Sequence, residues 1–168
     1  MSTRVAAMAV AAAVFILDRL TKLWIEANVP LHGGFSVIPG FFDIVHARNR
    51  GAAFGMLAET EGLLRPLLLV GVSMAVLVLI AVALLKQAPD GEAPTRVTMA
   101  GLSLVFGGAL GNVYDRVVRG EVTDFLEFYQ GEWRFAAFNV ADSAITTGAA
   151  LLILDMWRTR HRHSNHVS

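Results

Sequence analysis

The chain has 168 residues, of which 55% are hydrophobic, with a mean hydropathy of +0.54 and a formal net charge of zero. This composition is unusual for a soluble domain and favours a membrane protein that forms a single unit over residues 1–168. A neutral chain without a basic stripe argues against a nucleic-acid partner, and the lack of cysteine excludes disulfides, thiolate metal sites and cysteine nucleophiles.

Four apolar stretches are each close to the roughly 20 residues that a membrane-spanning helix requires. They cover approximately residues 5–27, 63–85, 97–117 and 136–157. The first could be a cleavable signal peptide, since a cation precedes an alanine-rich run. Its helical pattern continues through Asp18–Ile25 without a loop, which favours a retained anchor. We therefore expect an all-α membrane fold with four transmembrane helices.

Basic residues at the ends of these stretches predict how the chain is oriented. Arg4, the link that contains Lys86 and Arg96, and the tail from Arg158 would lie inside under the positive-inside tendency. With an even number of spans, both termini would then be cytoplasmic.

Two longer segments, at approximately residues 28–62 and 118–135, would lie on the outer side. The first contains apolar runs at Phe35–Pro39 and Phe41–Val45, punctuated by Gly and Pro. These runs predict short strands at the membrane surface.

Polar residues in the predicted spans gather at one depth. An ionisable side chain in hydrocarbon is costly unless it is paired or faces a polar cavity. At about 1.5 Å per residue, three spans place polar groups near their outer ends. These groups are Asp18, Lys22, Asn112, Asp115, Asn139 and Asp142. Their common level predicts a site.

Some polar residues have a simpler explanation than catalysis. Asp18 and Lys22 are spaced i, i+4, which favours a structural ion pair. His161, His163 and His166 could bind a metal, but they lie in a terminal tail, so we expect no metal site there.

Three acids, Asp115, Asp124 and Asp142, are candidates for chemistry. At least two of them could share one cavity, where paired carboxylates cannot both ionise easily. An aspartic peptidase needs this arrangement, because one acid takes a proton from water while the protonated partner polarises the scissile carbonyl. The alternative is that these acids only cap or pair at helix ends.

Sequence neighbours help to choose between these acids. Asp115 is followed by Arg116, which favours a permanently ionised, structural carboxylate. Asp124 lies between Thr123 and Phe125 without a neighbouring cation, which favours a raised pKa. Asp124 is therefore the better candidate of these two.

Glycines in the chain are expected to serve packing and loop geometry. Gly107, Gly108 and Gly111 have the small-residue spacing that lets helices approach closely. Gly51–Gly55 lacks the context of a phosphate loop, and we interpret it as a tight loop that, with Asn49, lies close to an extended substrate. No HExxH and no cofactor signature is present, so hydrolysis would rely on acids and water without a cofactor.

Five sequence blocks resemble the bacterial lipoprotein signal peptidases, also called signal peptidase II, in the order in which that family has them. They are D-R-L-T-K at Asp18–Lys22, R-N-R-G-A-A-F-G at Arg48–Gly55, G-G-A-L-G-N-V-Y-D-R at Gly107–Arg116, V-T-D-F at Val122–Phe125, and F-N-V-A-D-S-A at Phe138–Ala144. Arg19 stands where a glutamine is common, and Thr123 where a valine is.

The resemblance implies a four-helix membrane fold with a small β-rich platform on the extracytoplasmic face. It also implies an enzyme of the bacterial cytoplasmic (inner) membrane that cleaves prolipoproteins immediately before a diacylglyceryl-modified cysteine. The family's catalytic aspartates map onto Asp124 and Asp142. Its supporting residues map onto Asp18, Lys22, Asn49, Gly51, Asn112, Asp115, Arg116 and Asn139.

Two other classes of protein remain as alternatives. A small transporter or proton channel commonly places ionisable groups through the midplane and has related halves, whereas here the acids gather at one level and the halves do not match. A noncatalytic assembly factor would tolerate the loss of either acid of the pair.

Overall fold

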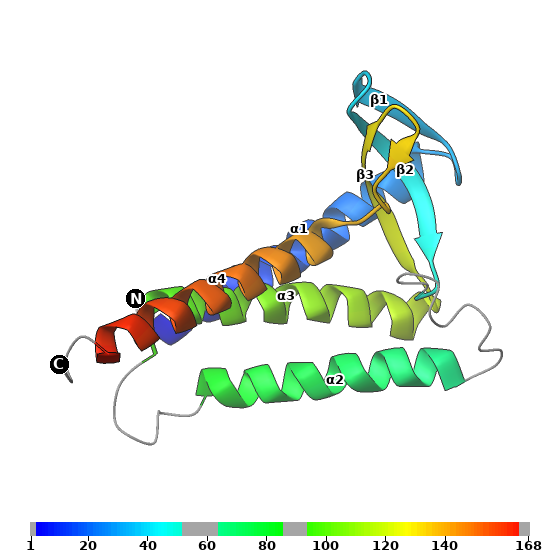
Figure 1. Cartoon of the computed structure of the whole chain (residues 1–168). Helices are drawn as coiled ribbons and strands as arrows, with labels where there is room; N and C mark the ends of the chain where they lie inside the picture. The colour runs from blue at the N-terminus through cyan, green and yellow to red at the C-terminus, as the bar shows by residue number, and fades with distance from the viewer. Residues whose placement is uncertain (1–2, 52–63, 86–93, 165–168) are drawn as a thin grey trace.

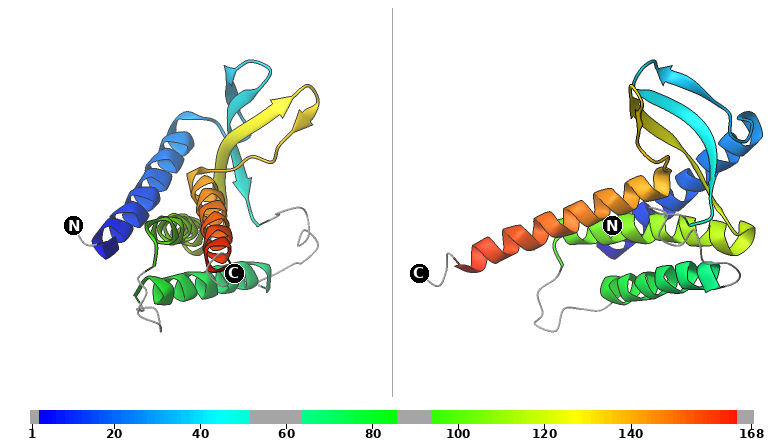
Figure 2. Two further views of the ribbon diagram at one scale, coloured as in Figure 1. Left: turned by 60° about the vertical axis from the view of Figure 1, so that its left-hand side comes forward. Right: turned by 45° about the vertical axis from the view of Figure 1, so that its right-hand side comes forward.

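The computed structural model describes residues 3–51, 64–85 and 94–164, in which long helices lie alongside one another and a sheet stands at one end (Figures 1 and 2). The helices are α1 (Thr3–Asn28), α2 (Leu64–Leu85), α3 (Arg96–Arg119) and α4 (Val140–Ser164). The strands are β1 (Gly34–Ile38), β2 (Phe42–Asn49), β3 (Val122–Gln130) and β4 (Trp133–Arg134). Helix α1 begins and α4 ends at the end away from the sheet (Figure 1).

Among the described residues, three helices are long and apolar enough to cross a membrane. Their candidate spans are Leu67–Leu84, Arg96–Arg119 and Val140–Thr159, and the first is the most apolar, with a mean hydropathy of 3.0. These spans agree with three of the four predicted ones, although residue 63 and the link at 86–93 lie outside the described residues. Helix α4 begins at Val140 and not near Ala136, because Asn139 caps it.

Helix α3 packs between α1 and α4, and its glycines make this close packing possible. A Cβ atom at Gly107 would lie 2.5 Å from the carbonyl oxygen of Ala11 on α1, and one at Gly108 would lie 2.4 Å from that of Ala141 on α4. The predicted packing role of these glycines is therefore confirmed. By contrast, nothing lies within 4 Å of a Cβ built at Gly71 on α2.

A tight turn connects α3 to the sheet. Gly120 has a φ of 78°, a left-handed conformation that glycine adopts without steric cost, and its N–H donates to the carbonyl of Arg116 (3.1 Å). Strand β3 begins two residues later, at Val122. The turn therefore brings the start of β3 back beside the end of α3.

The sheet is antiparallel, with the strand order β1-β2-β3-β4. Strands β1 and β2 confirm the strands predicted near residues 35–39 and 41–45, whereas β3 and β4 occupy a segment for which no strand was predicted. Asp124 on β3 pairs with Ala47, and Val122 pairs with Asn49. Because side chains alternate along a strand, Asn49 and Asp124 are diagonal neighbours on one face.

Backbone hydrogen bonds attach the start of α4 to β3. The N–H groups of Phe125 and Leu126 both donate to the carbonyl of Phe138, at 2.9 and 2.8 Å. The N–H of Phe138 donates back to the carbonyl of Leu126 (3.0 Å). Asn139, the next residue, is thereby held beside Asp124.

Candidate active site

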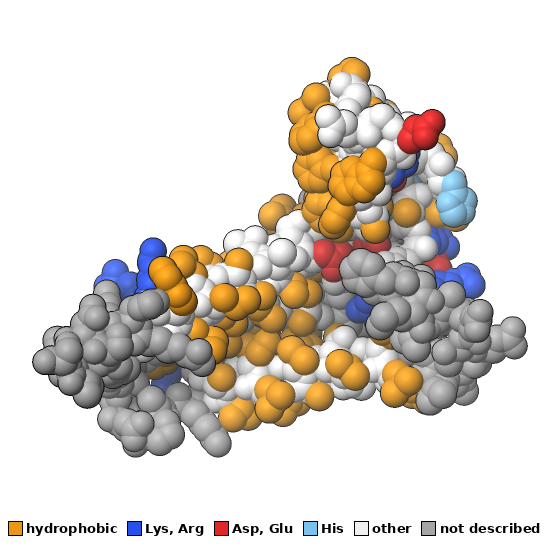
Figure 3. Space-filling model, viewed as in Figure 1, with side chains coloured by type: hydrophobic (Ala, Val, Ile, Leu, Met, Phe, Trp, Pro, Cys, Tyr) orange, Lys and Arg blue, Asp and Glu red, His pale blue; other side chains and the backbone are white. Residues whose placement is uncertain are grey.

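Polar side chains converge where α1, α3 and α4 meet β3. Figure 3 shows acidic side chains gathered at the junction between the sheet and the helices, next to the apolar surface of the helices. Among the described residues, the polar or charged side chains buried at this junction are Asp18, Lys22, Asn112, Asp115, Thr123, Asp124 and Asn139. The structure thus brings together the groups that were predicted to share one level.

Asp124 is almost inaccessible, with 3% of its surface exposed. Its carboxylate accepts hydrogen bonds from the side-chain amides of Asn139 (2.7 Å) and Asn49 (3.0 Å). Burial raises the pKa of Asp124 to about 6, and the charge of Asp142 raises it too, while the two hydrogen bonds act in the opposite direction. The raised pKa that its sequence neighbours suggested is confirmed.

Asp142 lies in the first turn of α4 and is only partly buried. One carboxylate oxygen accepts from the amide of Asn112 (2.7 Å), and the other from the backbone N–H of Asn139 (3.3 Å). The N–H of Asp142 donates back to the Asn139 side-chain oxygen (2.9 Å). This reciprocal pair is a capping box, so Asp142 has a structural role at the helix start whatever else it does.

Asn139 connects the two acids. Its side-chain amide donates to Asp124, and its backbone N–H donates to Asp142. The two carboxylates are also close enough for their charges to interact. One fully buried residue therefore sets the positions of both.

A second cluster of charges lies directly behind these acids. The ammonium of Lys22, which is fully buried, lies 2.8 Å from Asp18, 2.7 Å from Asp115 and 3.1 Å from the amide oxygen of Asn112. The ammonium donates hydrogen bonds to Asp18 and Asn112 and forms an ion pair with Asp115, whose Oδ2 accepts no hydrogen bond within the described residues. The predicted pair of Asp18 and Lys22 is present, and Asp115 shares it.

The outer oxygens of this cluster are occupied as well. Asp18 accepts a hydrogen bond from the backbone N–H of Ala141 on α4 (3.0 Å), and Asp115 pairs with Arg19. The Arg19 guanidinium also lies 4.8 Å from the ring centroid of Tyr114. The cations that pair with Asp115 are therefore Lys22 and Arg19, and not its sequence neighbour, because residue 116 points to another side of the helix.

Arg116 lies near Asp142 and Asp124. It is half-buried, and its guanidinium donates weakly to the Asn112 carbonyl (3.4 Å), whereas its Nε has no hydrogen-bond partner among the described residues. Its charge interacts most strongly with Asp142, and then with Asp124 and Asp115. Arg116 is thus a cation that faces the acids without a close ion pair among the described residues.

Asn49 also shapes the loop that follows β2. Its side-chain oxygen accepts from the N–H of Gly51 (2.8 Å), and Gly51 has a φ of 93° and contacts Leu69 on α2. A side chain at this position would be strained. The remainder of the predicted loop, residues 52–55, lies outside the described residues.

The sequence did not predict that Glu26 and Thr123 support the site. The Thr123 hydroxyl donates to Glu26 (2.7 Å), which also pairs with Arg119, so β3 is tied to the end of α1. The i, i+4, i+8 spacing from Asp18 through Lys22 could have indicated that Glu26 shares their face. The side chains of His161 and His163, and all of His166, lie outside the described part of the chain.

Replacing Lys22 by Ala should reduce the yield of folded protein in membranes together with any activity. The change leaves two carboxylates buried without their shared cation, a penalty of about 3–5 kcal/mol. Arg19→Gln is the matched control, because it removes one cation from the same cluster but leaves Lys22 on both acids, and its folded yield should stay near wild type. Fluorescence size-exclusion chromatography of membrane extracts measures the yield. Normal yield for Lys22→Ala would contradict a structural role for the cluster.

A family model described as signal peptidase (SPase) II matches residues 10–158. Two curated relatives are each described as a lipoprotein signal peptidase. The one from Solibacter usitatus (strain Ellin6076) is 45% identical over 159 residues, which are 95% of this chain and 94% of the relative. The one from Pseudomonas aeruginosa (strain UCBPP-PA14) is 45% identical over 148 residues, which are 88% and 85% of the two chains.

Two solved structures described as bacterial membrane enzymes share this fold, each with a TM-score of 0.76. They are 32% and 33% identical to this chain and cover 91% and 90% of it, and this chain covers 88% and 92% of theirs. The family match, over residues 10–158, spans every described residue of the site, and the matches to the relatives extend over most of the sequence. The chain therefore belongs to the signal peptidase II family and is a membrane peptidase.

Proposed function

We propose that this protein is an aspartic endopeptidase of the bacterial cytoplasmic membrane that removes signal peptides from diacylglyceryl-modified prolipoproteins. It cleaves on the N-terminal side of the lipidated cysteine, with Asp124 and Asp142 as the catalytic pair and without a cofactor. Family membership and the names of the relatives support the substrate class. The observation that carries the mechanism is the connection of the two carboxylates through Asn139.

In the proposed mechanism Asp124 carries the proton of the pair and Asp142 is ionised. Asp142 takes a proton from water as the water oxygen attacks the scissile carbonyl carbon, and Asp124 gives its proton to the carbonyl oxygen. The tetrahedral intermediate then collapses, its C–N bond breaks, and Asp142 gives its proton to the leaving amine. The remaining hydroxyl proton returns to Asp124 as the carboxylic acid product forms, so the pair regains its starting state.

Residues around the pair have distinct proposed roles. Asn112 and Asn139 orient the carboxylates, and Asp18, Lys22 and Asp115 support Asn112 from behind. We assign substrate contacts to three groups at the front. They are Arg116, whose Nε is unpartnered among the described residues, and Asn49 with Gly51, whose extended segment lies beside Asp124.

We also propose that α1 is a fourth span. Its 26 residues extend about 39 Å at 1.5 Å per residue, which exceeds the thickness of the hydrocarbon core. Its polarity has an internal explanation, because Asp18 and Lys22 are 0% exposed. Its outer surface is apolar and includes Met8, Leu20 and Trp24.

With four spans, one integral membrane domain over residues 1–168 has both termini in the cytoplasm. Arg4, Arg96 and Arg158 then lie at the cytoplasmic end, as the positive-inside tendency favours. The sheet and the acids lie at the opposite end, so the proposed active site is near the extracytoplasmic face.

Asp124→Asn and Asp142→Asn should each abolish cleavage while folded yield and thermal stability stay near wild type. An amide is nearly isosteric with a carboxylic acid but cannot make the proton transfers. Purified variants incubated with a diacylated precursor and assayed for signal-peptide release give the measurement. Appreciable turnover by either variant would contradict the assignment and favour a noncatalytic role for the pair.

The pH dependence tests the protonation of Asp124. Because kcat/KM requires one proton on the pair, it should fall as the pH rises through about 6, the pKa of Asp124. Asn49→Ala removes a hydrogen bond that favours ionised Asp124. The fall of kcat/KM in the pH profile should therefore move to higher pH by about one unit. Arg48→Gln changes the preceding residue, whose pairing is with Glu121, and should leave this fall at the wild-type pH. A fall of kcat/KM that moves to lower pH in Asn49→Ala, or that stays at the wild-type pH, contradicts the assignment of the proton to Asp124.

Cleavage should depend on the lipid as well as on the peptide. Acids near the outer surface can meet a scissile bond only if the substrate is held at that depth, and a spanning signal helix can slide and tilt at modest cost. Acyl chains contribute about 0.8 kcal/mol per buried CH₂ and can fix the modified cysteine beside the acids. A diacylated precursor should therefore have a far higher kcat/KM than the same precursor with unmodified cysteine. Equal values in the same bilayer would reduce the proposal to a general intramembrane aspartic peptidase.

A further inference from the structure

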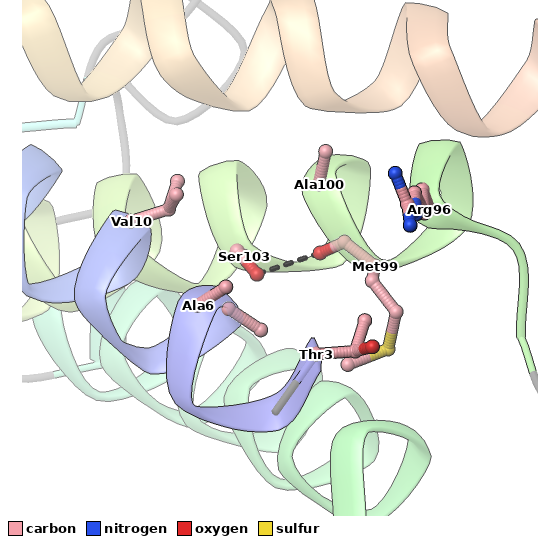
Figure 4. Close-up of a pocket in the computed structure, with 8 residues that line it drawn as sticks. Thr3, Ala6, Val10, Arg96, Met99, Ala100 and Ser103 are labelled. Atoms are coloured by element: carbon pink, nitrogen blue, oxygen red, sulfur yellow. Dashed lines mark hydrogen bonds between the residues drawn. The ribbon is translucent and has the colours of Figure 1, made fainter. Parts of the chain in front are cut away.

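A cavity of about 310 Å³ lies between α1 and α3, at the end of the helices away from the sheet and the acids. Figure 4 shows the side chains that line it. Ala6 and Val10 on α1 and Met99 and Ala100 on α3 form apolar walls, and Arg96 lies at the mouth, in the first turn of α3. The cavity is separate from the site described above.

The packing of the two helices explains why the cavity exists. Helices α1 and α3 approach closely at Ala11 and Gly107, where a Cβ built on Gly107 would lie 2.5 Å from the backbone oxygen of Ala11. Nearer the start of α3, the facing residues Ala6 and Ala100 are too small to fill the space between the helices. The cavity thus lies between this close contact and the end of the bundle that carries Arg96.

The polar groups of the cavity are unevenly distributed. At the deep end, the Ser103 hydroxyl donates to the carbonyl of Met99 (2.6 Å), so this donor is already used (Figure 4). At the mouth, the polar residues Thr3 and Arg96 are exposed, and no ion pair with an acid is found for Arg96 in the described parts of the chain. A ligand that fits must therefore be apolar inside and anionic at its outer end.

We propose that this cavity binds an anionic phospholipid, with the phosphate on the Arg96 guanidinium and one acyl chain along the wall formed by Ala6, Val10 and Ala100. Basic pockets between spanning helices on the cytoplasmic side are suited to such headgroups. The seven-residue rise from Arg96 to Ser103 gives a depth of about 10 Å, enough for part of an acyl chain. The bilayer supplies this lipid, which is distinct from the diacylglyceryl group of the proposed substrate.

The test measures lipid binding and does not rely on catalysis. Native mass spectrometry counts the phosphatidylglycerol or phosphatidylcholine that the full-length protein retains after detergent purification and titration with each lipid. Wild type should prefer phosphatidylglycerol. Arg96→Gln should weaken phosphatidylglycerol binding about fivefold, the usual effect of one basic residue near a membrane surface, and should leave phosphatidylcholine unchanged. Ala100→Leu should lower the retention of both lipids, because the added side chain fills the cavity.

Arg4→Gln is the matched control. Arg4 is an exposed cation in the first turn of α1, at the end of the bundle that carries Arg96, and it is not among the residues that line the cavity. Its loss should therefore leave lipid retention at the wild-type value. Unchanged circular dichroism and monodispersity establish that each variant is folded. Equal retention of the two lipids, or an equal effect of Arg4→Gln and Arg96→Gln, would overturn the proposal. Glycerol phosphate that competes as well as the lipid would also overturn it, because the acyl chain would then contribute nothing.

Discussion

The buried ammonium of Lys22 is the constraint on which the rest of the site depends. In apolar surroundings such a cation is tolerated only when all of its donors are satisfied. Here Lys22 donates to Asp18 on its own helix and to Asn112 on α3 and forms an ion pair with Asp115 on α3, and Asp18 in turn accepts from the backbone N–H of Ala141 on α4. Because lipid provides little hydrophobic drive for helix association, these polar contacts fix how the three helices are rotated and aligned.

The same ammonium determines the polarity of the hydrogen bonds that reach the acids. Lys22 can only donate, so Asn112 must turn its amide oxygen toward Lys22 and its NH₂ group toward Asp142. The side chain of Asn139 is oriented in a corresponding way: its NH₂ group donates to Asp124, and its oxygen accepts from the N–H of Asp142. A structural charge cluster therefore presets the donors around the proposed catalytic pair.

The sequence predicts the parts of this site that depend on helix geometry. Apolar length and the rise per residue placed Lys22, Asn112 and Asp142 at one level, and the structure brings them together. The position of Asp124 was beyond such reasoning, because it depends on the register of β2 with β3 and on the contact of β3 with Phe138. The ion-pair partners of Asp115 were beyond it for a similar reason, since Arg19 and Lys22 lie on another helix.

The charges of the whole centre explain why one acid should hold a proton. Three cations, Arg19, Lys22 and Arg116, face four carboxylates, those of Asp18, Asp115, Asp124 and Asp142. A net charge in a poorly hydrated region is costly, and one bound proton makes the group neutral. Asp18 and Asp115 each have a cation within an ion pair, whereas Asp124 is buried between neutral amides and has a pKa raised to about 6. These surroundings favour the proposed protonation of Asp124. Asp142, the proposed base, is the more accessible of the two acids, and its charge interacts with that of Arg116.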